Sequence, residues 1–212
     1  MLVTPGIVHS LHSAVTNHAI DKVEARADAF YVMDGADIDD NVATAVNNVV
    51  NLDTNYVATY YPWVKMDDPA GTGQVWVPPS VVIPGVIAFT DRVAHEWFAP
   101  AGLTRGGLTN VRLTKKKLTH TDRDTLYDGR VNPIASFPGQ GVVVFGQKTL
   151  QAKPSALDRI NVRRLVIYLK KQISILSTQI LFEQNVQATW TRFKALVEPF
   201  LSNVLTEFGI TD

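Results

Sequence analysis

The sequence predicts an α/β fold: a mixed sheet with βαβ units flanked by helices, ending in two long C-terminal helices. Three observations lead to this prediction. β-rich runs at 29–33 and 56–64 enclose a helical pattern with short connections, an order typical of right-handed units with parallel strands. Residues 142–145 are apolar without interruption, as expected of a strand covered on both faces. Residues 159–181 and the stretch after Asn185 carry apolar side chains at helical spacing.

The N-terminal third is expected to begin with a turn and a helix. Pro5 and Gly6 form a turn signal, and residues 12–27 place apolar side chains at helical spacing. After the first β-rich run, Asp39 or Asp40 is expected to cap the next helix, because aspartate oxygens accept from free amides of the first turn.

The middle of the chain alternates between short elements and loops. Residues 67–73 are rich in turn formers and mark a weak candidate boundary within what we interpret as one α/β domain, residues 1–212. Ser80 is expected to cap a helix that runs to about His95, with Pro84 near its first turn, where proline is tolerated. The remaining expected elements are a strand at 74–77, an irregular loop at 98–107, a strand at 111–117, a helical turn at 121–127 and a strand at 132–137.

The two C-terminal helices have the clearest pattern in the sequence. The first carries one apolar seam whose members alternate at spacings of four and three residues: Val162, Val166, Leu169, Ile173, Leu176 and Ile180. Asn185 is the expected N-cap of the second helix and Gly209 its left-handed C-terminal residue. The stripe of the second helix consists of Trp190, Phe193, Val197, Leu201, Val204 and Phe208.

Composition limits the classes of function. Lys plus Arg and Asp plus Glu number 20 each, so no net charge attracts the chain to nucleic acid or to an anionic membrane. The hydrophobic fraction of 46% is sufficient for a core, and no apolar run approaches the roughly 20 residues needed to span a bilayer. The absence of cysteine excludes disulfides, thiolate metal sites and cysteine nucleophiles.

Residues that could support chemistry do not form a recognisable site. His95–Glu96 and the pair His9 and His12 could supply zinc ligands, but neither forms the H-E-x-x-H motif. The aspartates at 37–40 lack the glycine and terminal glutamate of a calcium loop. The glycines at 139–141 precede a strand, whereas a phosphate loop precedes a helix. We therefore expect no catalytic residue, no metal and no cofactor.

Two groups of basic residues are candidates for an interface. Lys115, Lys116 and Lys117 form the densest basic run. On the first long helix, Arg164 and Lys171 lie near the pole opposite the apolar seam, and Arg163 and Lys170 lie on the adjacent flank. Solvated charges are one interpretation, and contact with an acidic protein surface is the other.

Several motifs, in a fixed order, resemble contractile tail sheath proteins of myoviruses and their relatives in R-type bacteriocins and type VI secretion. These are WVPPSVVIPGVIAFTDRVAHEWFAPAGLTRGGL with its Ala99–Gly102 element, NPIASFPGQGVVVFGQKTL, the RINVRRL helix start, and LFEQN before a tryptophan-containing helix. The resemblance covers residues 28–209, and it is the order of separate motifs that makes it specific.

The resemblance implies a structural subunit that polymerises around a tail tube and contracts to drive the tube through the host envelope. It implies other sheath subunits, the tube protein and the baseplate as partners, and a place in the virion tail after assembly in the host cytoplasm. It also implies that the chain is a fragment of a longer sheath protein. The alternative hypothesis is an α/β enzyme that binds a nucleotide or small molecule at the carboxyl ends of its strands.

Overall fold

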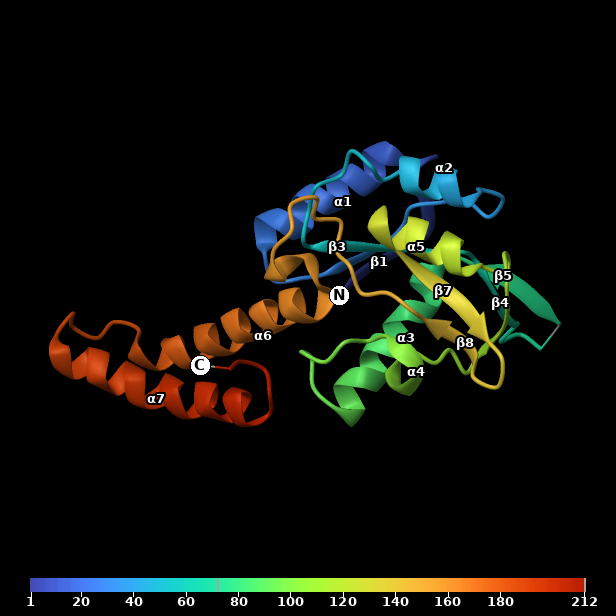
Figure 1. Cartoon of the computed structure of the whole chain (residues 1–212). Coiled ribbons are helices and arrows are strands. Elements are labelled where there is room, and N and C mark those ends of the chain that lie inside the picture. The colour runs from blue at the N-terminus through green and yellow to red at the C-terminus, as the bar shows by residue number, and fades with distance from the viewer. Residues whose placement is uncertain (72, 212) are drawn as a thin grey trace.

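The computed structural model describes residues 1–71 and 73–211, and its centre is a five-stranded mixed sheet, seen in the middle of the body in Figure 1. The strand order is β1-β2-β3-β7-β8, with β1 to β7 parallel and β8 antiparallel to β7. This confirms the predicted fold class. The strands are β1 (Leu2–Val8), β2 (Tyr31–Asp34), β3 (Val57–Tyr61), β7 (Val131–Phe137) and β8 (Gly141–Val144).

Helices cover both faces of this sheet. Successive residues of a strand point to opposite faces, so Tyr31 and Met33 pack in one apolar cluster while Val32 lies in the other. The first cluster lies under α1 (Ser13–Arg26), α2 (Val42–Asn47) and α5 (His120–Asp128), and the second under α3 (Pro79–Val93). Coverage on both faces explains why β2 and β3 are buried at every position.

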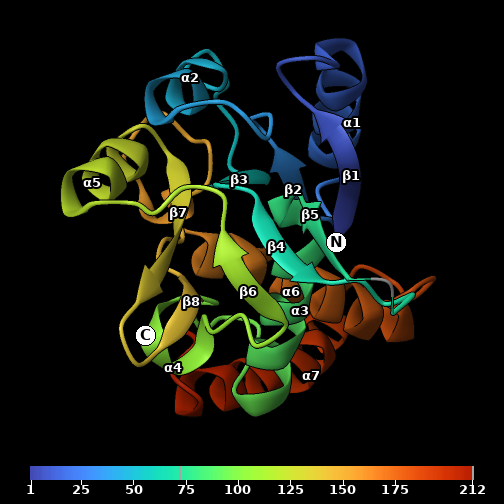
Figure 2. The ribbon, with the colours of Figure 1, turned by 90° about the vertical axis from the view of Figure 1, so that its right-hand side faces the viewer.

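A second, antiparallel sheet with the order β5-β4-β6 packs beside the first (Figure 2). Its strands are β4 (Val64–Asp67), β5 (Gln74–Val77) and β6 (Val111–Thr114), and the short α4 (Gly102–Arg105) precedes β6. The segment proposed as a weak boundary connects β4 to β5, with the Asp68 amide donating to the Gly73 carbonyl at 2.8 Å.

The last two helices form a hairpin that projects from the sheet-containing body (Figure 1). The 3₁₀ turn η1 (Ala156–Asp158) leads into α6 (Ile160–Ser177), which ends in a second 3₁₀ turn, η2 (Thr178–Ile180), before α7 (Gln187–Thr206). A small cluster containing Leu165, Phe200 and Val204 joins the two helices near the body. The two predicted long helices are therefore confirmed.

One turn prediction and one strand prediction were wrong. Pro5 and Gly6 do not form a turn but lie within β1, where the pairing with β2 shifts register between Val3 and Val8. A proline is tolerated there because β1 is an edge strand. The run 56–64 is two strands, because the chain leaves the first sheet at Tyr61 and enters the second.

The predicted caps of α2 and α3 were also wrong. Asn41 caps α2 by accepting from the Thr44 amide at 2.9 Å, whereas Asp40 accepts from the Asp37 amide. Ser80 lies inside the first turn of α3 and bonds to a different element, as described below.

The ends of α7 differ from the prediction as well. Val186 holds the N-cap position, while Asn185 accepts a hydrogen bond from the Trp190 indole at 2.8 Å. Phe208 adopts the left-handed conformation (φ 62°) in place of Gly209. Gly209 serves close packing instead, because a Cβ there would lie 2.5 Å from Cγ1 of Val204 and 3.1 Å from the Trp97 ring.

Candidate assembly interface

The basic run at 115–117 lies at the end of β6 and is partly engaged within the body. The Lys115 ammonium lies 3.0 Å from the Asp39 carboxylate and 5.6 Å from the centre of the Trp76 ring. Lys116 is half-buried, and Lys117 is exposed. Of this run, Lys117 is therefore the residue most available to a partner.

Arg163, predicted as part of an exposed row, is buried, with 5% of its surface exposed. Its guanidinium stacks over the Tyr56 ring at 4.2 Å, so it connects α6 to the loop before β3. Burial lowers the pKa of Arg163, and the neighbouring Tyr56 partly offsets this effect. The position of this residue indicates a role in holding the start of α6 on the body.

Arg164 also contacts its own chain. Its guanidinium lies 2.5 Å from the Asp91 carboxylate of α3 and donates to the Glu96 carbonyl at 3.1 Å, and its side chain is only 12% exposed. The pole of α6 opposite the predicted seam therefore faces the body near its start. Lys170 and Lys171, further along the helix, are exposed and line a cleft.

The segment after α3 is a docking site for the hairpin that the sequence did not reveal. The Trp97 indole donates to the Glu207 carbonyl at the end of α7 (2.9 Å), and the His95 ring stacks on Trp97 and meets the Glu207 carboxylate at 3.2 Å. The side-chain amide of Asn161 donates to the Trp97 carbonyl at 3.2 Å. The predicted helix boundary near His95 was the only signal for this segment in the sequence.

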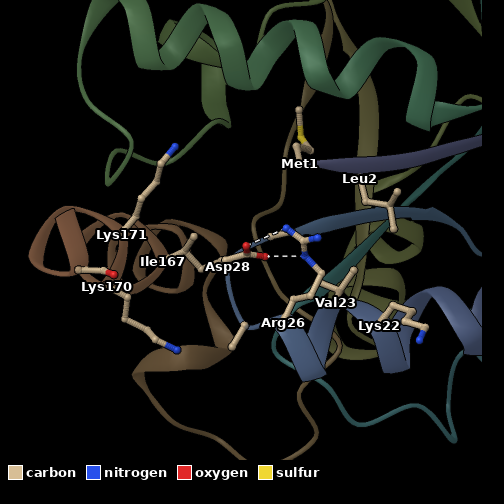
Figure 3. Close-up of a pocket in the computed structure, with 12 residues that line it drawn as sticks. Met1, Leu2, Lys22, Val23, Arg26, Asp28, Ile167, Lys170 and Lys171 are labelled. Carbon is tan, nitrogen blue, oxygen red and sulfur yellow. Dashed lines mark hydrogen bonds and ion pairs between the residues drawn. The ribbon is translucent and has the colours of Figure 1, made fainter. Parts of the chain in front are cut away.

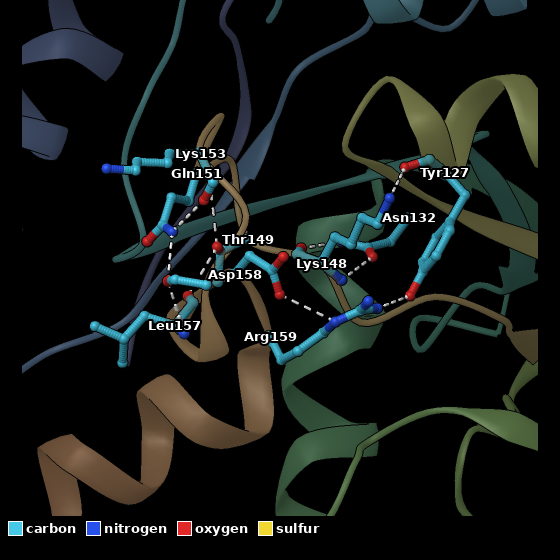
Figure 4. A network of polar contacts seen from close by, with 10 residues as sticks. Tyr127, Asn132, Lys148, Thr149, Gln151, Lys153, Leu157, Asp158 and Arg159 are labelled. Atoms are coloured by element: carbon cyan, nitrogen blue, oxygen red, sulfur yellow. Dashed lines mark hydrogen bonds and ion pairs between the residues drawn. The ribbon is translucent and has the colours of Figure 1, made fainter.

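A polar network fixes the start of α6 from the other side (Figure 4). The Asn132 side chain, in the middle of the sheet, bonds to both the amide and the carbonyl of Lys148. The Lys148 ammonium donates to the Tyr127 carbonyl, and the Arg159 guanidinium meets both the Tyr127 hydroxyl and Asp158. The loop that leads into α6 is thus tied to both β7 and α5.

The carboxyl ends of the parallel strands, where the alternative enzyme hypothesis places a ligand, are occupied by buried polar side chains. The Asp34 carboxylate accepts from the Ser80 amide (3.0 Å) and hydroxyl (2.6 Å), and all of Asp34 is buried. Burial raises the pKa of Asp34, and the Ser80 hydrogen bonds oppose the shift. His9 bonds to Thr16 at 2.7 Å. These groups satisfy one another and attach α3 and α1 to the sheet.

Metal-binding and membrane-spanning features were sought in the part of the chain that the structure describes. Within residues 1–71 and 73–211, no group of three or more His, Cys, Asp or Glu side chains is arranged to hold a metal ion. No helix in these same ranges is long and apolar enough to cross a membrane.

Apolar side chains are exposed along the projecting hairpin. Phe182 is fully exposed, and Leu181 and Trp190 are 61% and 53% exposed. Exposed apolar surface of this kind marks an interaction site in many proteins. The predicted seam of α6 is only half-buried. The buried residues of this helix are Ile160, Arg163 and Leu165, none of which belongs to the seam.

Comparison with known proteins identifies the family. Residues 1–150 match the family described as phage tail sheath protein central domain. The chain belongs to the phage tail sheath family. The tail sheath protein of Vibrio phage KVP40 is 37% identical over 82% of this chain, and that of Enterobacteria phage T4 is 35% identical over 76%. The chain spans about a quarter of the length of each of these sheath proteins (26%).

Solved structures of contractile injection systems contain the same fold. The baseplate of the anti-feeding prophage includes a chain that matches 94% of this one with a TM-score of 0.77 and 25% identity. The sheath complex of the PVC extracellular contractile injection system, in its contracted state, matches 86% with a TM-score of 0.76 and 28% identity. This chain covers 51% and 50% of those two chains. The resemblance read from the motif order is confirmed.

Proposed function

We propose that this chain is part of a structural subunit of a contractile tail sheath, which polymerises around the tail tube and contracts to drive the tube through the host envelope. The observation that carries the proposal is the similarity, over 86% of the chain, to the contracted sheath of the PVC injection system. The subunit belongs to the virion tail and is assembled in the host cytoplasm.

This role requires no bond-making chemistry. Energy stored in a metastable polymer is released when subunits rearrange as nearly rigid bodies, so neither a nucleotide nor a metal is needed. The buried, mutually satisfied groups around Asp34 and Ser80 suit a rigid body, because they hold α3 against the sheet rather than face a ligand. We infer that the chain is not an enzyme.

The partners we propose are other sheath subunits, the tail tube protein and the baseplate, without nucleic acid or membrane. Lys117, Lys170 and Lys171 are the basic candidates that are exposed and form no ion pair with a described residue. Arg163 and Arg164 hold α6 on the body, and Lys115 pairs with Asp39. The exposed apolar side chains of the hairpin, together with these lysines, form the surface available to neighbours.

Immunogold electron microscopy of contractile tails from the source of the chain tests this function. Antibodies raised against the purified chain should label the outer sleeve along its length, and the labelled zone should shorten on contraction. Antibodies first adsorbed with the chain serve as the control. Label confined to the tube, or tails without label, would refute the sheath assignment.

A further inference from the structure

A cleft of about 780 Å³ lies between α1 and α6, on the side of the body where the hairpin departs (Figure 3). One wall is the last part of α1, with Lys22 and Arg26. The other wall is one face of α6, where Ile167, Lys170 and Lys171 follow one another at helical spacing. Its volume lies within the range of about 300–1,000 Å³ that is typical of ligand-binding pockets.

The side chains that line the cleft carry an excess of positive charge. Arg26 is bound to Asp28 through two hydrogen bonds of 3.0 and 2.8 Å, which occupy the middle of the cleft (Figure 3). Lys22, Lys170 and Lys171 are exposed, and none forms an ion pair with another described residue. Three ammonium groups without a carboxylate therefore line the two walls.

The chemistry of the walls favours a carboxylate-rich polypeptide over a nucleic acid. Among the described residues that line this cleft none is aromatic; Phe30 and Tyr168 line only the smaller cleft that continues it, so bases could not stack beside the three lysines. Arg26, the guanidinium among the described lining residues, is already held by Asp28, so the cleft offers no free arginine fork for bidentate binding of a phosphate. Leu2 and Ile167 are partly exposed and provide apolar surface beside the lysines, which suits a peptide with mixed apolar and acidic side chains.

A second cleft of about 280 Å³ continues the first and gives the groove a direction. Lys171 and Ile167 line both clefts, and the second also contains Asp91, Glu96 and Arg164. The Asp91 carboxylate is neutralised by Arg164. The groove is thus basic at the α1 end and mixed in charge toward α3, which would fix the orientation of a bound segment.

We propose that the α1–α6 cleft binds an acidic segment of a neighbouring sheath subunit, with carboxylates paired to Lys22, Lys170 and Lys171. The choice of a sheath subunit as the source rests on the proposed function, whereas the acidic chemistry rests on the cleft alone. The curated relatives offer ample chain for such a segment, because the region matched here is only 26% of their length. An ionic contact of this kind is specific yet weakened by salt.

The test measures binding of a short fluorescein-labelled peptide in which glutamate alternates with valine, using fluorescence anisotropy on the purified chain. A peptide with glutamine in place of glutamate and a single-stranded thymidine oligonucleotide are the comparison probes. The cleft variant is Lys22→Gln with Lys171→Gln. The matched control, Lys153→Gln with Lys194→Gln, removes two exposed lysines outside the cleft and has the same net charge.

The chain should bind the glutamate peptide, with an affinity that falls as salt is raised. The cleft variant should bind this peptide about tenfold more weakly than the parent, whereas the affinity of the control variant should change by less than about twofold. Both variants should keep the Tm of the parent, since all four lysines are exposed. If the cleft variant unfolds, each single substitution replaces it. Absence of peptide binding, equal weakening in the control, or tighter binding of the oligonucleotide would overturn the proposal. The immunogold labelling of tails described above tests the sheath assignment separately, so its result does not depend on these binding measurements.

Discussion

The sheet-containing body and the α6–α7 hairpin place their apolar side chains differently. In the body, strands such as β2 and β3 are buried on both faces by helices of the same chain. In the hairpin, the helical periodicity is clearer, yet the buried apolar residues of α6 and α7 are only Ile160, Leu165, Val197 and Val204. Periodicity therefore shows that a helix has an apolar face, but it does not show that the same chain covers that face.

The largest expected effect on stability is the loss of a buried isoleucine from the body, compared with the loss of a half-exposed isoleucine from the hairpin. Ile134 in β7 is fully buried between strands and α3, so Ile134→Ala should cost about 3 kcal/mol and lower Tm by about 10 °C. Ile173 in α6 is half-exposed, so Ile173→Ala should cost about 1 kcal/mol or less. Urea and thermal unfolding measure both. Equal losses would show that the hairpin is as well packed as the body.

The second prediction concerns the joint between the two regions. Arg164→Ala removes the ion pair with Asp91 and leaves a partly buried carboxylate, which should cost about 2 kcal/mol. Lys171→Ala, two turns further along α6, should change the free energy of unfolding by no more than about 0.5 kcal/mol. A double-mutant cycle with Asp91→Ala isolates the coupling energy of the pair. A coupling near zero would mean that this ion pair does not hold the hairpin on the body.

The structure of the body could be predicted from the sequence more fully than the way the hairpin attaches to it. Strands β2, β3, β7 and β8 followed from apolar runs, because burial leaves a direct pattern, whereas the edge strand β1 and the division of 56–64 between two sheets did not. The position of Arg163 and Arg164 did not follow, since helical spacing gives an angle around α6 but not the location of the body. Likewise, the sequence around Trp97 and around Glu207 does not predict their contact, because the two residues are 110 positions apart.

For the candidate site, the sequence predicted the basic character of α6 but not the cleft itself. The sequence supplied a basic face on α6, but the opposite wall comes from α1, more than 140 residues earlier, and the pairing of the walls depends on the whole fold. Lys22 and Arg26 were not candidates, because in the sequence they are ordinary charges on an amphipathic helix. A cleft formed by two distant helices leaves no spacing pattern in either.

A smaller effect should appear as a dependence on pH within the body. The pKa of Asp34 is raised above 3.8 in the folded chain by burial. As pH rises, the unfolded chain therefore loses this proton first, and the native state loses stability between 3.8 and the folded pKa. Asp34→Asn cannot titrate, so its stability relative to the parent should increase across this window. Urea unfolding at several pH values measures the difference. Parallel curves would show that burial of Asp34 is not coupled to its ionisation.

The smallest effect on stability is expected at the tip of the hairpin, where Phe182 is fully exposed with a φ of 67°. Phe182→Ser removes no packing, so Tm should change by no more than about 1 °C. Phe182→Gly should be neutral or slightly stabilising, because glycine adopts a positive φ without strain. If the tip is an assembly surface, Phe182→Ser should still reduce incorporation of the sheath protein into tails, measured by gold labelling. A fall in Tm in both variants would instead mean that the ring packs within its own subunit. Normal incorporation with unchanged Tm would mean that the exposed ring has no role in assembly.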